Sequence, residues 1–309
     1  MFQLRFDLRV PPFSTVTHAE QYRVMLEMCR WADTRGFAGV VLSEHHGTED
    51  GFMNAPLAIS AAVLGATQHV RCSISALLVP YHDPLRLAED IATIDLLAPG
   101  RLAVIAGLGY RESEFEMFGK DRTRRGQLSE DAIRTMLTAW KGEPFEYNGR
   151  TAWVTPKPVT QPHPLIMVGG SAPVSARRAA RLHLPFLPMI GDPALAEVYR
   201  AEAKAVGYTD PFVSLPEGPG LVLVTEDPDA SWARIGEHLL YDAQAYASWQ
   251  YPDQRSGWHV PADTVEGVRA SGQYEILTPE QCVDLVHRQQ HATLHPLVAG
   301  IDPAIGWET

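Results

Sequence analysis

Short apolar segments alternate with longer helical patterns along most of this 309-residue chain. This alternation is typical of βα units around a parallel sheet rather than of a β-sandwich. We expect strands near residues 2–8, 39–42, 71–78, 101–106, 165–168, 186–188, 220–225 and 295–299. We expect helices near residues 17–35, 54–67, 84–97, 126–141, 172–182, 193–206, 229–247 and 279–291. Eight parallel strands close a (β/α)8 TIM barrel of about 250 residues plus insertions, so we predict an α/β fold with a single such domain over residues 1–309.

Two segments interrupt the repeat. Residues 142–164 contain alternating apolar residues around the turn dipeptide Asn148-Gly149, which predicts an inserted β-hairpin. Residues 248–276 are irregular and predict a long loop, which is either a lid or substrate wall over the barrel mouth or a packed surface excursion. Its aromatic residues are Trp249, Tyr251, Trp258 and Tyr274.

Composition narrows the choice of partners. A net charge of −11 argues against nucleic acid, because phosphate binding needs a concentrated basic face. The basic stretch 120–125 is interrupted by an acid and is either a solvated loop or an anion site. No run of about 18 uncharged apolar residues predicts a membrane span, and the chain opens directly in a strand, so we expect a cytoplasmic protein. Cys29, Cys72 and Cys282 are far apart in sequence, which predicts core residues rather than disulfides or a zinc site.

Ionisable residues follow the second predicted strand at Glu44-His45-His46. In a barrel, catalytic side chains lie on the loops after the carboxyl ends of the strands. Imidazole titrates near working pH, so a histidine here is a candidate acid or base. Successive side chains at a strand end alternate, so His45 and His46 should point apart and form a poor metal clamp. We predict no metal site; the alternative is a metal hydrolase that uses one histidine with Asp7.

Five short motifs follow one another along the chain: Glu44-His45-His46-Gly47-Thr48-Glu49, Leu64-Gly65-Ala66-Thr67, His82-Asp83-Pro84-Leu85-Arg86-Leu87-Ala88-Glu89-Asp90, Ala98-Pro99-Gly100-Arg101 and Gly169-Gly170-Ser171. In order and spacing they resemble the motifs of the bacterial luciferase-like flavin monooxygenases. The resemblance implies a (β/α)8 barrel that binds reduced FMN over the carboxyl ends of its strands. Oxygen would add to the flavin, and the flavin peroxide would oxidise a small, apolar organic substrate. A separate flavin reductase would supply the reduced FMN.

The same resemblance assigns residues to roles. His45 matches the histidine that acts beside the flavin, so it would be the catalytic acid or base, or a hydrogen-bond donor. Ser75 and Ala76 match a non-prolyl cis peptide bond beneath the flavin ring. Gly107 and Leu108 occupy positions where luciferase itself has a cysteine and an arginine, so these flavin contacts would differ.

The flavin phosphate would bind at the turn Gly169-Gly170-Ser171, which follows a predicted strand and opens a helix with unbonded amides. Luciferase has a glutamate at the position of Gly170, so here the backbone amides of Gly170 and Ser171 would hold the phosphate, with help from Arg177.

The helix near residues 54–66 is apolar nearly all round and rich in small residues, which predicts close contact with a second helix. In the related family the second histidine, here His46, lies toward the subunit contact. We therefore predict a homodimer; the alternative is a monomer whose insertions cover this helix. Arg86, Glu89 and Asp90 have the spacing of local ion pairs or of a subunit contact rather than of a reaction site.

Two other functions remain open. One is hydride transfer with a deazaflavin coenzyme on the same fold, without oxygen. The other is a non-catalytic flavin-binding or partner subunit, which the presence of His45 and of the small Ser75-Ala76 pair argues against.

Overall fold

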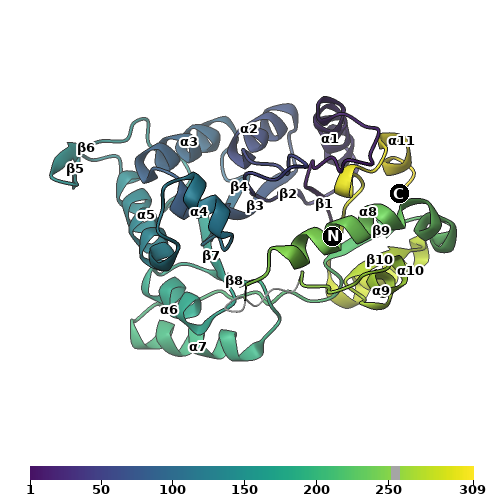
Figure 1. Cartoon of the computed structure of the whole chain (residues 1–309). Coiled ribbons are helices and arrows are strands. Elements are labelled where there is room, and N and C mark those ends of the chain that lie inside the picture. The colour runs from purple at the N-terminus through teal and green to yellow at the C-terminus, as the bar shows by residue number, and fades with distance from the viewer. Residues whose placement is uncertain (252–257) are drawn as a thin grey trace.

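A parallel sheet organises the molecule, as the computed structural model of residues 1–251 and 258–309 shows (Figure 1). Within this part of the chain the sheet has nine strands in the order β10-β9-β11-β1-β2-β3-β4-β7-β8. The strands are β1 (Phe2–Phe6), β2 (Gly39–Leu42), β3 (Arg71–Leu78), β4 (Leu102–Gly107), β7 (Leu165–Gly170), β8 (Phe186–Pro188), β9 (Leu221–Val224), β10 (Tyr274–Leu277) and β11 (Ala292–Leu294). The parallel βα order confirms the predicted α/β class.

The first seven predicted strands are present with small shifts at their ends, but the eighth prediction is wrong. The strand there is β11, which ends at Leu294, and residues 298–300 form a 3-10 turn instead. Pro296 has no N–H to donate to a ladder, so the strand stops before it. The sequence analysis also missed β10, a four-residue strand whose alternate side chains Tyr274 and Ile276 are buried.

Helices follow most strands. They are α1 (His18–Asp33), α2 (Pro56–Ala66), α3 (Pro84–Leu97), α4 (Glu112–Met117), α5 (Arg125–Ala139), α6 (Pro173–Arg181), α7 (Pro193–Ala205), α8 (Pro228–Ser248), α9 (Val265–Ala270), α10 (Pro279–Gln289) and α11 (Pro303–Gly306). All eight predicted helices are present, whereas α4, α9 and α11 were not predicted. Because α9 and β10 lie within residues 248–276, the prediction of one long loop there is wrong in that part; its residues 252–257 lie outside the described residues.

Helices α8 and α10 cover opposite faces of β9. Leu221 and Leu223 pack with residues of α8, whereas the intervening Val222 packs against Cys282 and Leu285 of α10. This alternation follows from the two-residue period of a strand. As a result, α8 runs across the centre of the molecule in Figure 1 and carries its last turn to the loops after β1 and β2.

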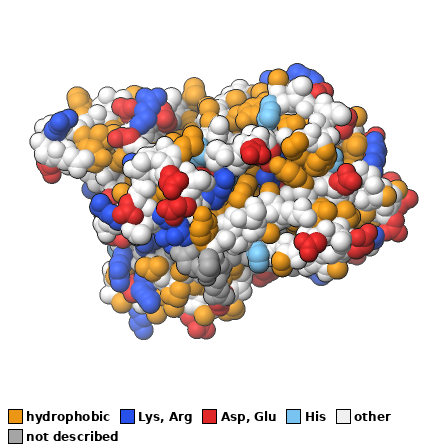
Figure 2. Space-filling model, viewed as in Figure 1, with side chains coloured by type: hydrophobic (Ala, Val, Ile, Leu, Met, Phe, Trp, Pro, Cys, Tyr) orange, Lys and Arg blue, Asp and Glu red, His pale blue; other side chains and the backbone are white. Residues whose placement is uncertain are grey.

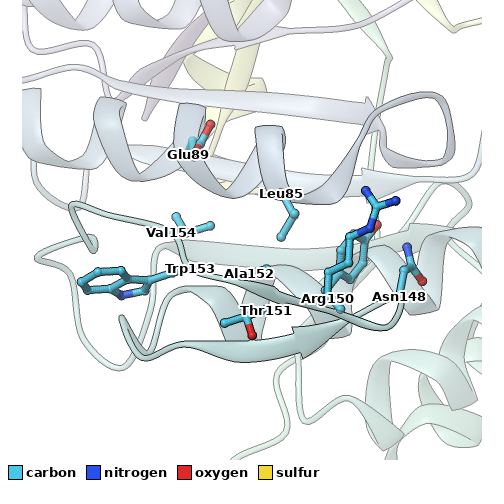
Figure 3. A pocket seen from close by; sticks show the side chains of 9 residues that line it. Leu85, Glu89, Asn148, Arg150, Thr151, Ala152, Trp153 and Val154 are labelled. Carbon is cyan, nitrogen blue, oxygen red and sulfur yellow. The ribbon is translucent and has the colours of Figure 1, made fainter.

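The predicted hairpin is present. Strands β5 (Phe145–Tyr147) and β6 (Arg150–Ala152) are antiparallel, and Asn148 and Gly149 both have positive φ, as a tight two-residue hairpin turn requires. The hairpin projects from one end of the molecule (Figure 1). Between it and α3 lies a pocket of about 490 Å³ whose walls include Leu85, Glu89 and Trp153 (Figure 3).

The structure also bears on the predictions for the cysteines, for Arg86 and for membrane spans. Cys29, Cys72 and Cys282 are buried free thiols. The exposed Arg86 forms ion pairs with Glu89 at 3.4 Å and with Asp90 at 2.9 Å, so local pairing is confirmed. In the part of the chain that the structure describes, the helices are all too short or too polar to cross a bilayer.

Candidate active site

His45 forms a buried pair with a carboxylate from another βα loop. Its side chain follows β2 and is 6% exposed. Nδ1 of His45 lies 3.0 Å from Oε1 of Glu114, which belongs to the short helix α4 after β4. The backbone N–H of His46 donates to the same oxygen, and Arg111 lies 3.1 Å from it. Glu114 therefore fixes the position of the imidazole and accepts its Nδ1 proton.

His46 faces a different carboxylate. Its Nε2 lies 3.0 Å from Oε1 of Glu44, and Nε2 of His82 lies 2.7 Å from the same oxygen. Burial alone raises the pKa of Glu44, but the hydrogen bonds from His46 and His82 outweigh that effect and lower the pKa to about 2. The two adjacent histidines thus contact separate carboxylates, in agreement with the predicted alternation. We call Glu44, His45, His46, His82 and Glu114 the histidine cluster.

An aromatic wall encloses the imidazole of His45. Its ring centroid lies 4.9 Å from that of Phe52, 5.6 Å from Tyr110, 6.1 Å from Tyr246 and 4.8 Å from Trp249. Burial lowers the pKa of His45, and the hydrogen bond to Glu114 offsets this only in part. The imidazole is therefore neutral at pH 7, with a proton on Nδ1 and a lone pair on Nε2. Nε2 lies 3.5 Å from the hydroxyl of Tyr110.

A second group of buried charges also contacts Trp249. Arg9, which is 1% exposed, forms ion pairs with Asp50 at 2.6 Å and with Asp242 of α8 at 2.9 Å. Asp7 accepts from the backbone N–H groups of Arg9 and Ala299. We call Arg9, Asp7, Asp50 and Asp242 the arginine cluster. It ties α8 to the loops after β1 and β2.

The carboxylate of Asp7 is an unusual member of that cluster. Burial and the neighbouring charge of Asp242 raise its pKa from 3.8 to about 7, although Arg9 acts in the opposite direction. The metal-hydrolase alternative paired His45 or His46 with a carboxylate such as Asp7. The structure instead places Asp7 in the arginine cluster, and the described residues contain no group of three or more His, Cys, Asp or Glu arranged to hold a metal.

Trp249 contacts both clusters. Its ring lies 5.2 Å from the guanidinium carbon of Arg9 and 4.5 Å from that of Arg111. It is the residue that ends α8, so the position of this helix determines how His45 is covered.

The residues predicted to lie beneath a flavin come together. The Ser75-Ala76 peptide bond is cis, as the family resemblance implied. A Cβ atom on Gly107 would lie 2.7 Å from Cβ of Ala76, so β3 and β4 are in close contact at these residues. Ser75, Ala76 and Leu108 are partly exposed, and β2, β3 and β4 are neighbours in the sheet.

The predicted phosphate turn lies at the junction of β7 and α6. Gly170 has a φ of 135°, and a Cβ atom there would lie 2.5 Å from Oγ of Ser175. Only glycine fits this turn, which brings Ser171 to the beginning of α6. Arg177, the predicted helper, is partly exposed on α6.

Sequence reasoning missed Glu114 and the arginine cluster. Glu114 lies in a six-residue helix that was not predicted, 69 residues after His45. His82 does occur in one of the family-like motifs, but nothing in the spacing placed it on Glu44.

Comparison with known proteins defines the family. A model of the luciferase-like monooxygenases matches residues 6–295. This chain belongs to that family. The luciferase-like chain is also similar over its whole length to an F420-dependent secondary alcohol dehydrogenase in complex with an F420-acetone adduct. The TM-score is 0.70 at 18% identity, with 100% of this chain and 96% of that chain covered, which confirms a fold of the TIM-barrel type.

Two named relatives are similar over about half of the luciferase-like chain. The oxygenase component of a flavin-dependent trigonelline monooxygenase from Acinetobacter baylyi is 30% identical over 167 residues, 52% of this chain and 46% of the relative. An FMNH2-dependent dimethylsulfone monooxygenase from Pseudomonas putida is 32% identical over 162 residues, 48% and 44% respectively. The chain thus spans about half the length of these curated relatives.

Proposed function

We propose that this chain is a flavin-dependent monooxygenase that uses reduced FMN and molecular oxygen to oxidise a small, apolar organic substrate. The observation that carries this proposal is the buried His45–Glu114 pair at the end of β2. On β3 and β4, the next two strands of the sheet, the cis Ser75-Ala76 bond and Gly107 are in close contact. A proton-transfer group would thus lie beside the ring of a flavin bound over these residues.

The residues present fit a flavin mononucleotide. Ser75, Ala76, Gly107 and Leu108 would lie under the ring, and the amides of Gly169, Gly170 and Ser171 at the beginning of α6 suit its phosphate. A bound reduced flavin would supply the electrons that activate oxygen. The protein would bind and orient the ring and exclude water, with Phe52, Tyr246 and Trp249 as the apolar wall.

His45 would move the proton. Glu114 holds the Nδ1 proton, so the neutral imidazole presents Nε2 as an acceptor, and the protonated ring can return the proton at the same atom. Tyr110 lies within reach of Nε2 and would orient the group that exchanges the proton.

The names of related proteins support a flavin or deazaflavin as the cofactor. One relative is named as FMNH2-dependent, which supports reduced FMN. Another is named as an oxygenase component, which supports a separate flavin reductase as partner. The F420-dependent structural neighbour favours a second candidate function, hydride transfer with a deazaflavin coenzyme.

We also propose that two copies of the chain form a homodimer through α2. Ala58, Ala62 and Gly65 are exposed on one face of α2, so a second helix would approach closely there. His46 is buried within its own chain against Tyr81 and Phe118, so in this subunit it contacts Glu44 and these rings.

The decisive test compares coenzymes and then removes His45. Enzyme-dependent oxygen uptake with reduced FMN, and none of the hydride transfer expected with reduced deazaflavin, would support the proposal; the reverse pattern would establish the second candidate. We expect His45→Ala to lower the turnover rate by about 10²–10⁴-fold while flavin affinity changes little. His287→Ala, on the exposed face of α10, is the matched control. Full activity of the His45→Ala variant would show that His45 is not the proton-transfer group, and no turnover of the wild type with either coenzyme would favour a non-catalytic subunit.

A further inference from the structure

Arg5 of β1 is a positively charged side chain that meets no carboxylate. Leu4 and Phe6 belong to the main hydrophobic core with residues of α1, so the alternation of the strand turns Arg5 to the opposite face of the sheet. Its Nη2 donates to Oγ of Ser43 at 2.9 Å, and among the described residues Arg5 forms this hydrogen bond and no ion pair. The side chain is partly exposed, so its remaining donors are accessible to a ligand.

His295 lies beside Arg5 on the neighbouring strand. Leu4 of β1 is paired with Leu294 of β11, so Arg5 and His295 each follow a paired residue. Neighbouring strands are about 4.8 Å apart, so the two side chains are adjacent on one face. His295 is 5% exposed, and its Nε2 has no hydrogen-bond partner in the part of the chain that the structure describes. A buried polar atom without a partner is unfavourable unless a ligand completes it.

The imidazole of His295 is a neutral group. Burial, and then the charge of Arg5, lower its pKa well below the usual range. A neutral imidazole with its proton on Nε2 donates a hydrogen bond, and the hydroxyl of Ser43, which accepts from Arg5, keeps its own proton to donate. A cation and two neutral donors thus lie together, which is a combination that suits a carboxylate.

Aromatic rings connect these donors to the histidine cluster. The guanidinium carbon of Arg5 lies 4.7 Å from the ring centroid of Trp258, and the ring of His295 lies 6.0 Å from the same centroid. Trp258 is stacked on Tyr246 of α8 at 5.8 Å. The ring of Tyr246 in turn lies 6.1 Å from that of His45. One aromatic ring therefore lies between the surroundings of Arg5 and the imidazole of His45.

The same arrangement limits the length of a ligand that reaches both places. Ser43, which holds Arg5, and His45 are two residues apart, so their Cα atoms are separated by at most about 7 Å. The intervening rings favour an apolar body over a polar one. A ligand with its carboxylate at Arg5 and its other end at His45 therefore needs a body about as long as one aromatic ring.

We propose that Arg5, Ser43 and His295 bind a carboxylate group of the substrate. The substrate would be a short carboxylic acid with an apolar body, which Trp258 and Tyr246 would contact. The carboxylate would accept charge-assisted hydrogen bonds from the free donors of Arg5 and further hydrogen bonds from the other two residues. The inference rests on the proposed function only for the reaction at the opposite end of the substrate.

Calorimetric titration with acids and their amides tests the site. Benzoate, phenylacetate and 3-phenylpropanoate are compared with benzamide, phenylacetamide and 3-phenylpropanamide, each added to the whole chain with FMN present. At least one acid should bind more tightly than its amide. Arg5→Met should weaken the binding of that acid by about 10- to 150-fold and change the binding of the amide little. Arg5→Lys, which keeps the charge but not the planar fork, should lose less, as should His295→Leu.

Arg200→Met is the matched control. Basic side chains are concentrated over α6 and α7 on the face shown in Figure 2, and Arg200 is exposed on α7 (Figure 2). An acid held only by the general positive charge of the surface would lose affinity in this variant too. Equal losses in Arg200→Met and Arg5→Met would contradict a built site.

A second measurement uses the wild-type protein and so does not depend on how a variant folds. Phenylglyoxal modifies accessible guanidinium groups, and mass spectrometry of the peptides follows Arg5 and Arg200 separately. The acid that binds best should slow the modification of Arg5, whereas its amide should not. Arg200 should react at the same rate throughout.

The outcomes separate this inference from the proposed function. If an acid binds through Arg5 but the enzyme takes up no oxygen with reduced FMN, the carboxylate site stands and the proposed function fails. If oxygen is taken up but every acid binds no better than its amide, or Arg5→Met binds the acids as tightly as the wild type, the inference is wrong while the proposed function stands. If neither acid binding nor oxygen uptake is seen, both fail.

Discussion

The histidine cluster and the arginine cluster are both buried, both contain carboxylates, and both contact Trp249. They differ in the cation that each carboxylate meets. Glu44 and Glu114 are paired with imidazoles, the side-chain type most often used for proton transfer. Asp50 and Asp242 are paired with a guanidinium, which stays charged. The first cluster can exchange protons with a ligand, whereas the second holds α8 against β1 and β2.

Removing the permanent positive charge of Arg9 should have the largest effect on the free energy of unfolding. Arg9→Met leaves Asp50 and Asp242 buried without a positive charge, so we expect the free energy of unfolding to fall by about 3–5 kcal/mol. Urea denaturation at pH 7.5 measures it. Arg23→Met, which breaks the exposed pair with Glu27, should change stability by less than about 1 kcal/mol. Equal losses in the two variants would contradict a structural role for the arginine cluster.

Removing a carboxylate from the histidine cluster should act on turnover instead. Glu114→Gln keeps the shape of the side chain but loses the charge that stabilises the His45 imidazolium. Turnover should fall, though by less than the about 10²–10⁴-fold expected for His45→Ala. Because Glu114 raises the pKa of His45, the pKa should fall further in the variant, as NMR titration of the imidazole would show. Glu116→Gln, exposed on the same helix, is the control; an unchanged imidazole titration in Glu114→Gln would argue against the pairing.

Removing the indole of Trp249 should have an intermediate effect on the free energy of unfolding. Trp249→Leu removes ring contacts with two arginines, each worth about 0.5–1 kcal/mol, so stability should fall by about 1–2 kcal/mol. His45 should also react faster with diethyl pyrocarbonate, since the ring that covers it is lost. The exposed Trp153→Leu serves for comparison. Unchanged reactivity of His45 would show that Trp249 does not cover it in solution.

Asp7 should give the smallest effect per pH unit, a slope of stability with pH. Its pKa is about 7 in the folded protein, above the value of 3.8 for an unperturbed aspartate. Between these values the folded state holds a proton that the unfolded state has released, so this group's contribution is complete below about pH 4 and is lost as pH rises through 7. The slope is at most about −1.4 kcal/mol per pH unit. Denaturation series from pH 4 to 8 should show a flatter slope for Asp7→Asn than for wild type; parallel slopes would contradict the raised pKa.

Local patterns predicted much of the framework. The hairpin followed from Asn148-Gly149, whose positive φ angles are favoured by these two residue types. Family-like motifs placed His45 at the end of β2 and the cis bond at Ser75-Ala76. The prediction failed where local signals were short or misleading, as for β10, α9 and the displaced strand β11.

The sequence by itself determined the alternation of strands and helices, the class of fold and the position of the candidate reaction loop after β2, because the periods of strands and helices are set by neighbouring residues. Only the tertiary structure decided the partners of the buried charges. Arg9 meets Asp50 across 41 residues and Asp242 across 233, and His45 meets Glu114 across 69. Such pairs depend on which loops the folded sheet brings together. The sequence separation of two residues does not predict whether their side chains are close in the fold.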